Sequence, residues 1–393
     1  MTPLAISART VTTALGAGCA ATLDALQAQR SGLAPVRFLD VPLPTWTGEV
    51  EAVDNVVLPA PLAEYDCRNN RLAWLGLQQD GFLDAVAVAR TRWGAGRVAV
   101  FLGTSTSGLL QTELAYRRRT PDAALPADFL YGPTHNTYSL AAFVTRALQL
   151  RGPGWVVSTA CSSSAKVFGN AARLIAAGLI DAAVVGGVDS LCLTTLYGFN
   201  SLELLSRDIC RPWDAARNGL SIGEAAAFAL VERDCAAPEG WLLGVGESND
   251  GHHMSTPHPE GAGAIAAMRG ALADAALHPA DIDYINLHGT ATPSNDAAED
   301  FAVSRVFGFD APCSSTKGAT GHTLGAAGAV EAVIALLAMR HGLLPAGLNV
   351  QRRDAALTLN YLLDNRRAPV RRVLSNSFGF GGSNASLVLG GAS

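Results

Sequence analysis

Three residues of this 393-residue chain have types and settings suited to acyl transfer: Cys161, His288 and His322. Cys161 follows the apolar run 155–160 and precedes three serines, so we expect it where a strand ends and a helix begins. Free backbone N–H groups and the positive end of a helix stabilise a thiolate at such a position, which makes Cys161 a candidate nucleophile. A small buried core cysteine is the alternative, because free thiols are often buried.

The two histidines lie in segments rich in glycine and threonine. His288 follows an expected strand and precedes Gly-Thr-Ala-Thr, and His322 follows Lys317-Gly-Ala-Thr-Gly just before an expected helix. A lone histidine in either setting is more often structural than catalytic. Two histidines and a cysteine at comparable strand-to-helix junctions favour acyl transfer, which needs a nucleophile, polarising donors and close backbone approach.

The elements that must position these residues alternate between short apolar strands and helices. The apolar runs predict strands at 97–103, 155–160 and 182–188, with a helix at 165–177. Strands that are apolar on both faces belong in a sheet covered by helices on each side. A layered α/β architecture is therefore expected.

The second half of the sequence repeats this arrangement. Strands are expected at 283–288 and 312–316, and helices at 295–307 and 324–340. The repetition indicates an internal duplication. We expect one half at 1–235, carrying Cys161, and the other at 236–393, carrying His288, Lys317 and His322.

Composition and charge narrow the function. A chain with 49% hydrophobic and 16% charged residues can bury a large core, and a net charge of −5 gives no basis for nucleic-acid binding. The seven cysteines form no Cys-x-x-Cys pair, so we expect no metal site and a reducing cytoplasm. His252, His253 and His258 match no zinc spacing and are expected in a solvated or structural loop. The sequence contains no run of about 20 uncharged apolar residues, so we expect no membrane span.

Four long motifs occur in a characteristic order. They are Ser158-Thr-Ala-Cys-Ser-Ser163, His288-Gly-Thr-Ala-Thr-Pro-Ser-Asn-Asp296, Lys317-Gly-Ala-Thr-Gly-His-Thr-Leu-Gly-Ala-Ala-Gly328 and Asn376-Ser-Phe-Gly-Phe-Gly-Gly-Ser-Asn384. With these motifs the chain resembles the β-ketoacyl-acyl carrier protein synthases over nearly its whole length. The resemblance implies an internally duplicated, thiolase-like five-layered αβαβα fold. It also implies a homodimer, or a heterodimer with a related ketosynthase or chain-length subunit.

The resemblance implies a role for each matching residue. Cys161 would accept an acyl group from acyl carrier protein, and His288 and His322 would promote decarboxylation of a malonyl group. Lys317 and Glu299 would pair to organise the site, and the backbone N–H groups of Cys161 and Phe380 would form an oxyanion hole. The residues implied to bind substrate are Thr290, Thr292, Thr106, Phe199 and Phe378, and those implied to dock the carrier protein are Arg68, Arg71 and Arg207. No cofactor is implied, because phosphopantetheine on the carrier holds the substrates.

The implied reaction is a decarboxylative Claisen condensation that releases CO2, in fatty-acid, polyketide or aryl-polyene synthesis. With the polar Thr106 and the sequence Arg68-Asn-Asn-Arg71, the chain resembles the ketosynthases of aryl-polyene pigments more than those of housekeeping fatty-acid synthesis. A non-catalytic chain-length partner is one alternative, although such subunits usually lack the nucleophile. A thiolase or a chalcone-synthase-like enzyme is another, but the latter uses a Cys-His-Asn set.

Overall fold

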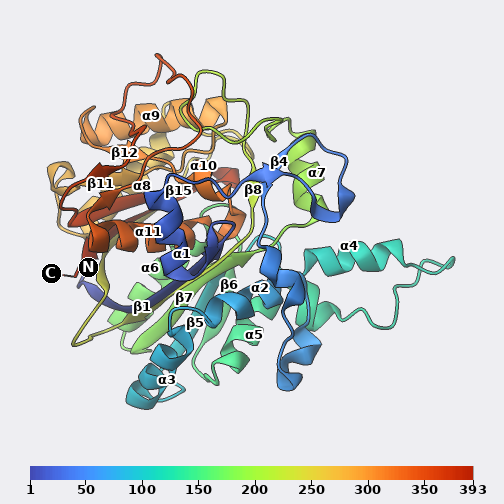
Figure 1. The fold of residues 1–393 in the computed structure, drawn as a ribbon. Helices are drawn as coiled ribbons and strands as arrows, with labels where there is room; N and C mark the ends of the chain where they lie inside the picture. Colours follow the sequence, from blue (N-terminus) through green and yellow to red (C-terminus); the bar gives the residue numbers. More distant parts are fainter. Residues whose placement is uncertain (393) are drawn as a thin grey trace.

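Two sheets of five strands, joined at their edges, form the centre of the computed structural model, which describes residues 1–392 (Figure 1). The strand order is β12-β11-β15-β16-β10-β1-β9-β7-β5-β6, with the short β2 (Gly16–Ala17) beside β1. The strands of the first half are β1 (Leu4–Thr13), β5 (Val98–Gly103), β6 (Gly154–Val157), β7 (Ala182–Asp189) and β9 (Ala225–Glu232). Those of the second half are β10 (Gly240–Asn249), β11 (Tyr284–Asn286), β12 (Cys313–Ser314), β15 (Arg372–Gly379) and β16 (Ser383–Gly391).

The two halves have the same topology. Numbered along its own half, each sheet has the order 3-2-4-5-1, as β6-β5-β7-β9-β1 and as β12-β11-β15-β16-β10. The first strands of the two halves, β1 and β10, pair antiparallel, with Leu4 opposite Leu242. The predicted internal duplication is therefore confirmed.

Helices cover both outer faces and fill the space between the sheets. The central layer contains α6 (Ser163–Ala176) and α11 (Ala327–His341). The outer face of the first sheet is covered by α2 (Arg68–Leu77), α3 (Phe82–Trp93) and α5 (Tyr138–Ala147), and that of the second by α8 (Ala262–Asp274) and α9 (Pro293–Phe307). The expected five-layered αβαβα architecture is confirmed.

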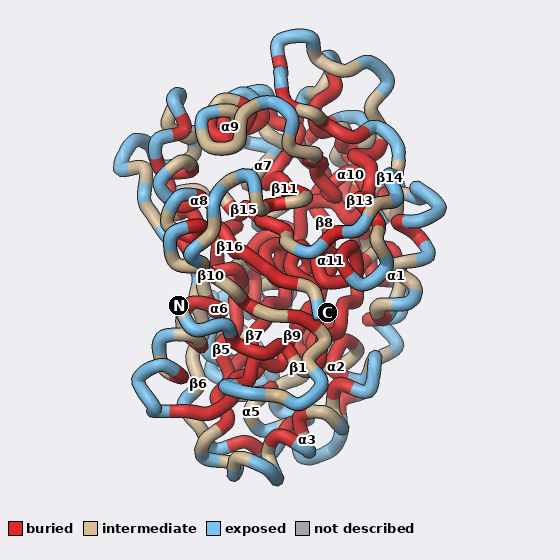
Figure 2. Tube along the Cα trace, turned by 90° about the vertical axis from the view of Figure 1, so that its left-hand side faces the viewer, coloured by how far each residue is buried: buried red, intermediate tan, exposed pale blue. Residues whose placement is uncertain are grey.

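The central layer explains the unusual apolarity of α11. Residues 327–339 of this helix are all buried, because both sheets pack against it, and Figure 2 shows this buried centre in red. A helix surrounded by protein is apolar on every side. Within the described residues, Leu324–His341 is also the one helix long and apolar enough to cross a membrane, but 89% of this segment is buried inside the fold. Its burial identifies it as a core helix.

A smaller part of the first half stands apart from the layers. The helix α4 (Leu109–Arg117) and residues 118–137 project from the body of the molecule, and we call residues 109–137 the arm (Figure 1). A short π-helix at Tyr131–His135 lies at its end. The remaining helices are α1 (Gly18–Gln27), α7 (Leu193–Ser201) and α10 (Lys317–Thr320). The remaining strands are β3 (Ala34–Pro35), β4 (Trp46–Gly48), β8 (Ile222–Gly223), β13 (Leu343–Leu344) and β14 (Arg366–Arg367).

Candidate active site

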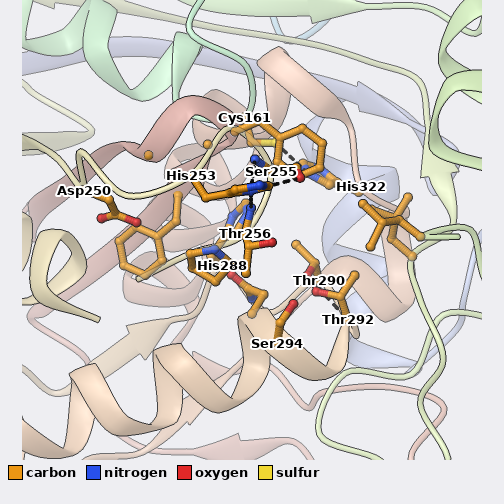
Figure 3. Close-up of a pocket in the computed structure, with 18 of the residues that line it drawn as sticks. Cys161, Asp250, His253, Ser255, Thr256, His288, Thr290, Thr292, Ser294 and His322 are labelled. Atoms are coloured by element: carbon orange, nitrogen blue, oxygen red, sulfur yellow. Dashed lines mark hydrogen bonds between the residues drawn. The ribbon is translucent and has the colours of Figure 1, made fainter. Parts of the chain in front are cut away.

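Cys161, His288 and His322 meet in one pocket, although they come from both halves of the chain (Figure 3). The Sγ atom of Cys161 lies 3.0 Å from Nε2 of His322. The ring centroids of the two histidines are 5.4 Å apart, and the rings are nearly perpendicular. The structure thus brings the three predicted residues together.

A strained turn points Cys161 into this pocket. Ala160, between β6 and α6, has a φ of 52°, in the left-handed region that costs a non-glycine residue about 1 kcal/mol or more. The hydroxyl of Ser163 donates to the carbonyl of Ala160 at 2.5 Å and accepts from the N–H of Thr159 at 2.9 Å. These bonds hold the turn and place Cys161 two residues before α6, near the start of a helix as the sequence predicts.

The charge state of Cys161 differs from the expected thiolate. Burial raises the pKa of the Cys161 thiol to about 11, although Lys317 and the backbone N–H groups of Phe380 and Cys161 itself lower it. Desolvation outweighs these donors, so the resting residue is a thiol. The donors are placed to stabilise negative charge when the thiol loses its proton. Gly379 allows this approach, since a Cβ there would lie 3.2 Å from the Cys161 nitrogen and 2.8 Å from the carbonyl oxygen of Thr159.

Hydrogen bonds fix the tautomer of both histidines. Nδ1 of His322 accepts the N–H of Leu324 at 3.2 Å, so the ring proton sits on Nε2, facing Cys161. Nδ1 of His288 lies 3.4 Å from the ammonium of Lys317, which can only donate, so its ring proton is also on Nε2. Burial, reinforced by the positive charge of Lys317, holds the pKa of each histidine well below its usual range. The pocket therefore presents two neutral N–H donors.

The predicted pairing of Lys317 with Glu299 is wrong. Lys317 forms its ion pair with Glu331 on α11 and also donates to the carbonyl of His288 at 2.5 Å. Glu299 instead accepts the N–H groups of His288 and Gly289, both at 2.7 Å, and so supports the turn that carries the histidine. The signal that sequence reasoning missed is that Glu331 is the one charged residue within the apolar segment 324–339.

Four of the five predicted substrate-binding residues line the pocket, and the fifth does not. Thr290, Thr292, Phe199 and Phe378 lie along its wall. Thr106 is buried away from this pocket, where its hydroxyl donates to Asp189 at 2.6 Å and accepts the N–H of Ser190 at 3.2 Å. The Thr106 hydroxyl has hydrogen-bond partners inside the protein, and the residue does not line this pocket. Its predicted role in substrate binding is therefore not supported by its position.

The predicted docking arginines differ in exposure. Arg68 is buried and forms a bidentate pair with Glu224, with both hydrogen bonds at 2.7 Å, so it is not available to a carrier protein. The prediction for Arg68 is wrong because this residue lies on the buried face of α2. Arg71 is partly exposed and pairs with Asp66. Arg207 is exposed, in the loop between the pocket residues Leu204 and Leu220.

The loop that carries His252 and His253 is exposed, as expected, and it also forms one side of the pocket. Asp250, His253 and residues 255–257 follow β10 and line the pocket opposite the threonines (Figure 3). Nδ1 of His253 accepts the N–H groups of Ser255 and Thr256 at 3.2 Å, which folds the loop on itself. The missed signal is position, because this loop follows an apolar strand as Cys161 and His288 do.

The three central residues also have a spacing that a metal ion could use. Across residues 1–392 they form the one group of three potential metal ligands, with their Sγ and ring nitrogen atoms within 4.8 Å of one another. A metal requires a free lone pair on each histidine nitrogen. Both Nε2 atoms carry protons here, so the arrangement suits hydrogen-bond donation rather than metal binding.

Comparison with known proteins reveals the relatives of this chain. The family model of the β-ketoacyl synthase N-terminal domain matches residues 71–237, and that of the C-terminal domain matches residues 240–351. The 3-oxoacyl-[acyl-carrier-protein] synthase 2 of Coxiella burnetii is 33% identical over 396 residues, covering 93% of each chain.

Solved structures agree with these sequence matches. A chain in the structure of the ketosynthase ApeO with its chain length factor ApeC, from Xenorhabdus doucetiae, has a TM-score of 0.91 and 40% identity, covering 99% of this chain and 98% of that one. A β-ketoacyl synthase from Burkholderia phymatum STM815 has a TM-score of 0.89 and 29% identity, with complete coverage of both chains. The thiolase-like fold is thereby confirmed, and the chain belongs to the β-ketoacyl synthase family, whose members are acyltransferases.

Proposed function

We propose that this protein is a β-ketoacyl-[acyl carrier protein] synthase that condenses an acyl group held on Cys161 with malonyl-acyl carrier protein. One observation carries the proposal: the Cys161 sulfur shares a pocket with two neutral imidazole N–H donors, His322 at 3.0 Å and His288 beside it. A nucleophile and paired donors are what acyl transfer and enolate stabilisation require.

The first step loads the enzyme. The Cys161 thiol loses its proton as its sulfur attacks the thioester carbonyl of an acyl carrier protein and a new C–S bond forms. The C–S bond to the carrier then breaks, and the departing carrier sulfur takes up a proton and leaves as a thiol. Negative charge gathers on the carbonyl oxygen during attack, where the N–H groups of Cys161 and Phe380 donate to it. Glycine at 379 lets this backbone lie against the nucleophile.

The second step forms the carbon–carbon bond. The Nε2–H groups of His288 and His322 donate to the malonyl thioester oxygen while the bond to the carboxylate breaks, CO2 leaves and its bonding electrons form an enolate. The enolate carbon then attacks the acyl carbonyl on Cys161, and the C–S bond breaks. The released Cys161 sulfur takes up a proton from solvent, which returns the thiol. Neutral donors suit this step, since charge develops only in the transition state and the intermediate. Lys317 keeps His288 in the required tautomer.

The similar structures support a finer assignment. Relatives crystallised as a ketosynthase with a chain length factor suggest a related subunit as the partner, and 40% identity to a chain of the ApeO–ApeC structure supports an aryl-polyene substrate. Arg207, which is exposed near the pocket, and Arg71, which is partly exposed, are the remaining candidates to attract an acidic carrier protein. The substrates would arrive on phosphopantetheine with no further cofactor. Cys161 must stay reduced, which agrees with a reducing cytoplasm.

The alternative, a non-catalytic chain-length subunit, has no need for a donor-lined cysteine. Loading assays separate the two functions. We expect Cys161→Ser to lose acyl labelling, and His288→Ala to keep labelling but fail to condense. Equal labelling of the serine variant would overturn the assignment. Parallel assays with polyenoyl and saturated acyl carriers test the pathway, and exclusive elongation of saturated chains would remove the aryl-polyene proposal.

A further inference from the structure

A carboxylate ties the arm to a helix of the pocket wall. Glu113 on α4 accepts the backbone N–H of Leu193 at 2.8 Å through one oxygen and that of Thr194 at 2.7 Å through the other. These are the first two residues of α7, and its own N-cap residue, Cys192, provides no side-chain cap. Glu113 therefore supplies both the hydrogen bonds and the negative charge that the start of a helix requires.

The other end of α7 reaches the active site. Phe199 lines the pocket, and its ring centroid lies 5.5 Å from that of Phe380. The backbone N–H of Phe380 is one of the donors aimed at the Cys161 sulfur. A shift of α7 would move the ring on which Phe380 rests and so change the position of this donor.

From this geometry we propose that Glu113 is a positioning residue for acyl transfer. By holding the first turn of α7, its carboxylate sets Phe199 against Phe380 and keeps the Phe380 N–H directed at Cys161. The inference rests on the proposed function, because it assigns that N–H to loading of the enzyme. It goes further by making the first step depend on a residue outside the pocket.

The same contact links the arm to the site. α4 forms the base of the arm, and its Thr112 is hydrogen-bonded to His135 near the arm's end. If the arm moves, Glu113 moves α7 with it, and α7 in turn shifts the backbone N–H of Phe380. The two histidine donors lie outside this path, because His288 is held by Lys317 and His322 by Leu324. Loading and decarboxylation should therefore respond differently to loss of Glu113.

Glu113→Gln is the direct test. Glutamine keeps the size of the side chain but offers one acceptor oxygen, so one N–H of α7 loses its partner and the helix loses its charge complement. We expect Cys161 to accept acyl groups from a loaded carrier about tenfold more slowly, the effect of losing roughly one charge-assisted hydrogen bond. Decarboxylation of malonyl carrier by the same variant should stay within about twofold of wild type, because its donors are untouched.

The chain contains a matched control. Both oxygens of Asp80 accept the N–H of Cys19 at 3.0 Å in the first turn of α1, so this carboxylate caps a helix that does not reach the pocket. We expect Asp80→Asn to lower the melting temperature about as much as Glu113→Gln while acylation stays normal. In a Phe199→Ala background, Glu113→Gln should cause little further loss, because both residues act through one contact.

A carrier-free readout separates this inference from the proposed function. Alkylation of Cys161 by iodoacetamide, followed against pH, reports the thiol pKa, and Glu113→Gln should raise it as the Phe380 donor moves away. If wild type accepts no acyl group, the proposed function fails and the alkylation profile still decides the role of Glu113. The inference would be overturned if Glu113→Gln had the alkylation profile and the acylation rate of the wild-type protein. It would also be overturned if the variant slowed loading and decarboxylation equally. If that variant does not fold, Glu113→Asp, one methylene shorter, provides the same comparison.

Discussion

Replacing Lys317 with methionine tests how the site keeps His288 as a neutral donor. The ammonium of Lys317 lies 3.4 Å from Nδ1 of His288, and both residues are buried. At that separation and an effective dielectric constant of about 20, a protonated His288 would be repelled by about 5 kcal/mol. This repulsion acts with burial to hold the pKa of His288 low, so Lys317→Met should raise that pKa and release the constraint on the ring tautomer.

The same substitution breaks a buried ion pair. Glu331 would be left without its partner, which we expect to cost about 3–5 kcal/mol of unfolding free energy. The double variant Lys317→Met/Glu331→Gln removes the uncompensated charge and should recover most of this loss. It is therefore the variant in which the chemical effect can be separated from instability. With one donor no longer fixed, we expect decarboxylation to fall about 10²- to 10³-fold.

Three measurements test this reasoning. Urea unfolding gives the free energies of the single and double variants, and CO2 release from malonyl carrier gives the rate. Nitrogen NMR of the histidine rings reports which nitrogen carries the proton. Wild-type decarboxylation in a folded double variant, or an Nε2 of His288 without a proton in the unmodified protein, would refute the reasoning.

Four further predictions concern the backbone, the pH dependence, the surface and a buried ion pair. Gly379→Ala should slow acylation and lower the melting temperature, because its Cβ would lie 2.8 Å from a backbone oxygen, whereas Gly132→Ala, with open space around it, should do neither. Burial raises the pKa of Glu299 to about 7, above its ordinary value of about 4.5. Its contribution to stability is therefore present below about pH 4.5 and is lost as the pH rises through 7, and urea unfolding of Glu299→Gln should show a flatter profile in that window. Arg207→Glu should raise the KM for carrier protein in a salt-dependent manner, and an unchanged KM would exclude Arg207 from docking. Arg68→Met should instead reduce the unfolding free energy, because it breaks a buried pair, and a change in KM alone would contradict that assignment.

The sequence predicted the elements that carry the chemistry. A helix expected at 165–177 is found at 163–176, and one expected at 295–307 is found at 293–307. Apolar runs bounded by small residues are strong local signals, so β6 and β11 could be located from the sequence. Both strands end earlier than expected, at Val157 and Asn286. Positions shortly after the ends of these two strands, one in each half, then identify Cys161 and His288 as candidates.

The errors concern side-chain partners and burial, which are set by tertiary packing. The second half of the chain contains two buried carboxylates that could pair with Lys317. The position of α10 relative to α11 determines that the partner is Glu331 and not Glu299. The sequence around Arg68 is typical of a protein surface. Its side chain is nevertheless buried, because it pairs with Glu224, which lies between β8 and β9. The thiol of Cys161 is governed by burial, which the helix-terminus argument does not include. Local pattern fixes elements, whereas charge pairing and desolvation depend on tertiary packing.

The most direct test of the account is the mass of the peptide that contains Cys161, measured before and after the two substrates are added in turn. An acyl-loaded carrier should add the acyl mass to this peptide. Malonyl carrier should then remove it, with release of CO2 and appearance of a β-ketoacyl product on the carrier. An unmodified Cys161 in a protein that still condenses, or an acyl group on another residue, would contradict the central claim.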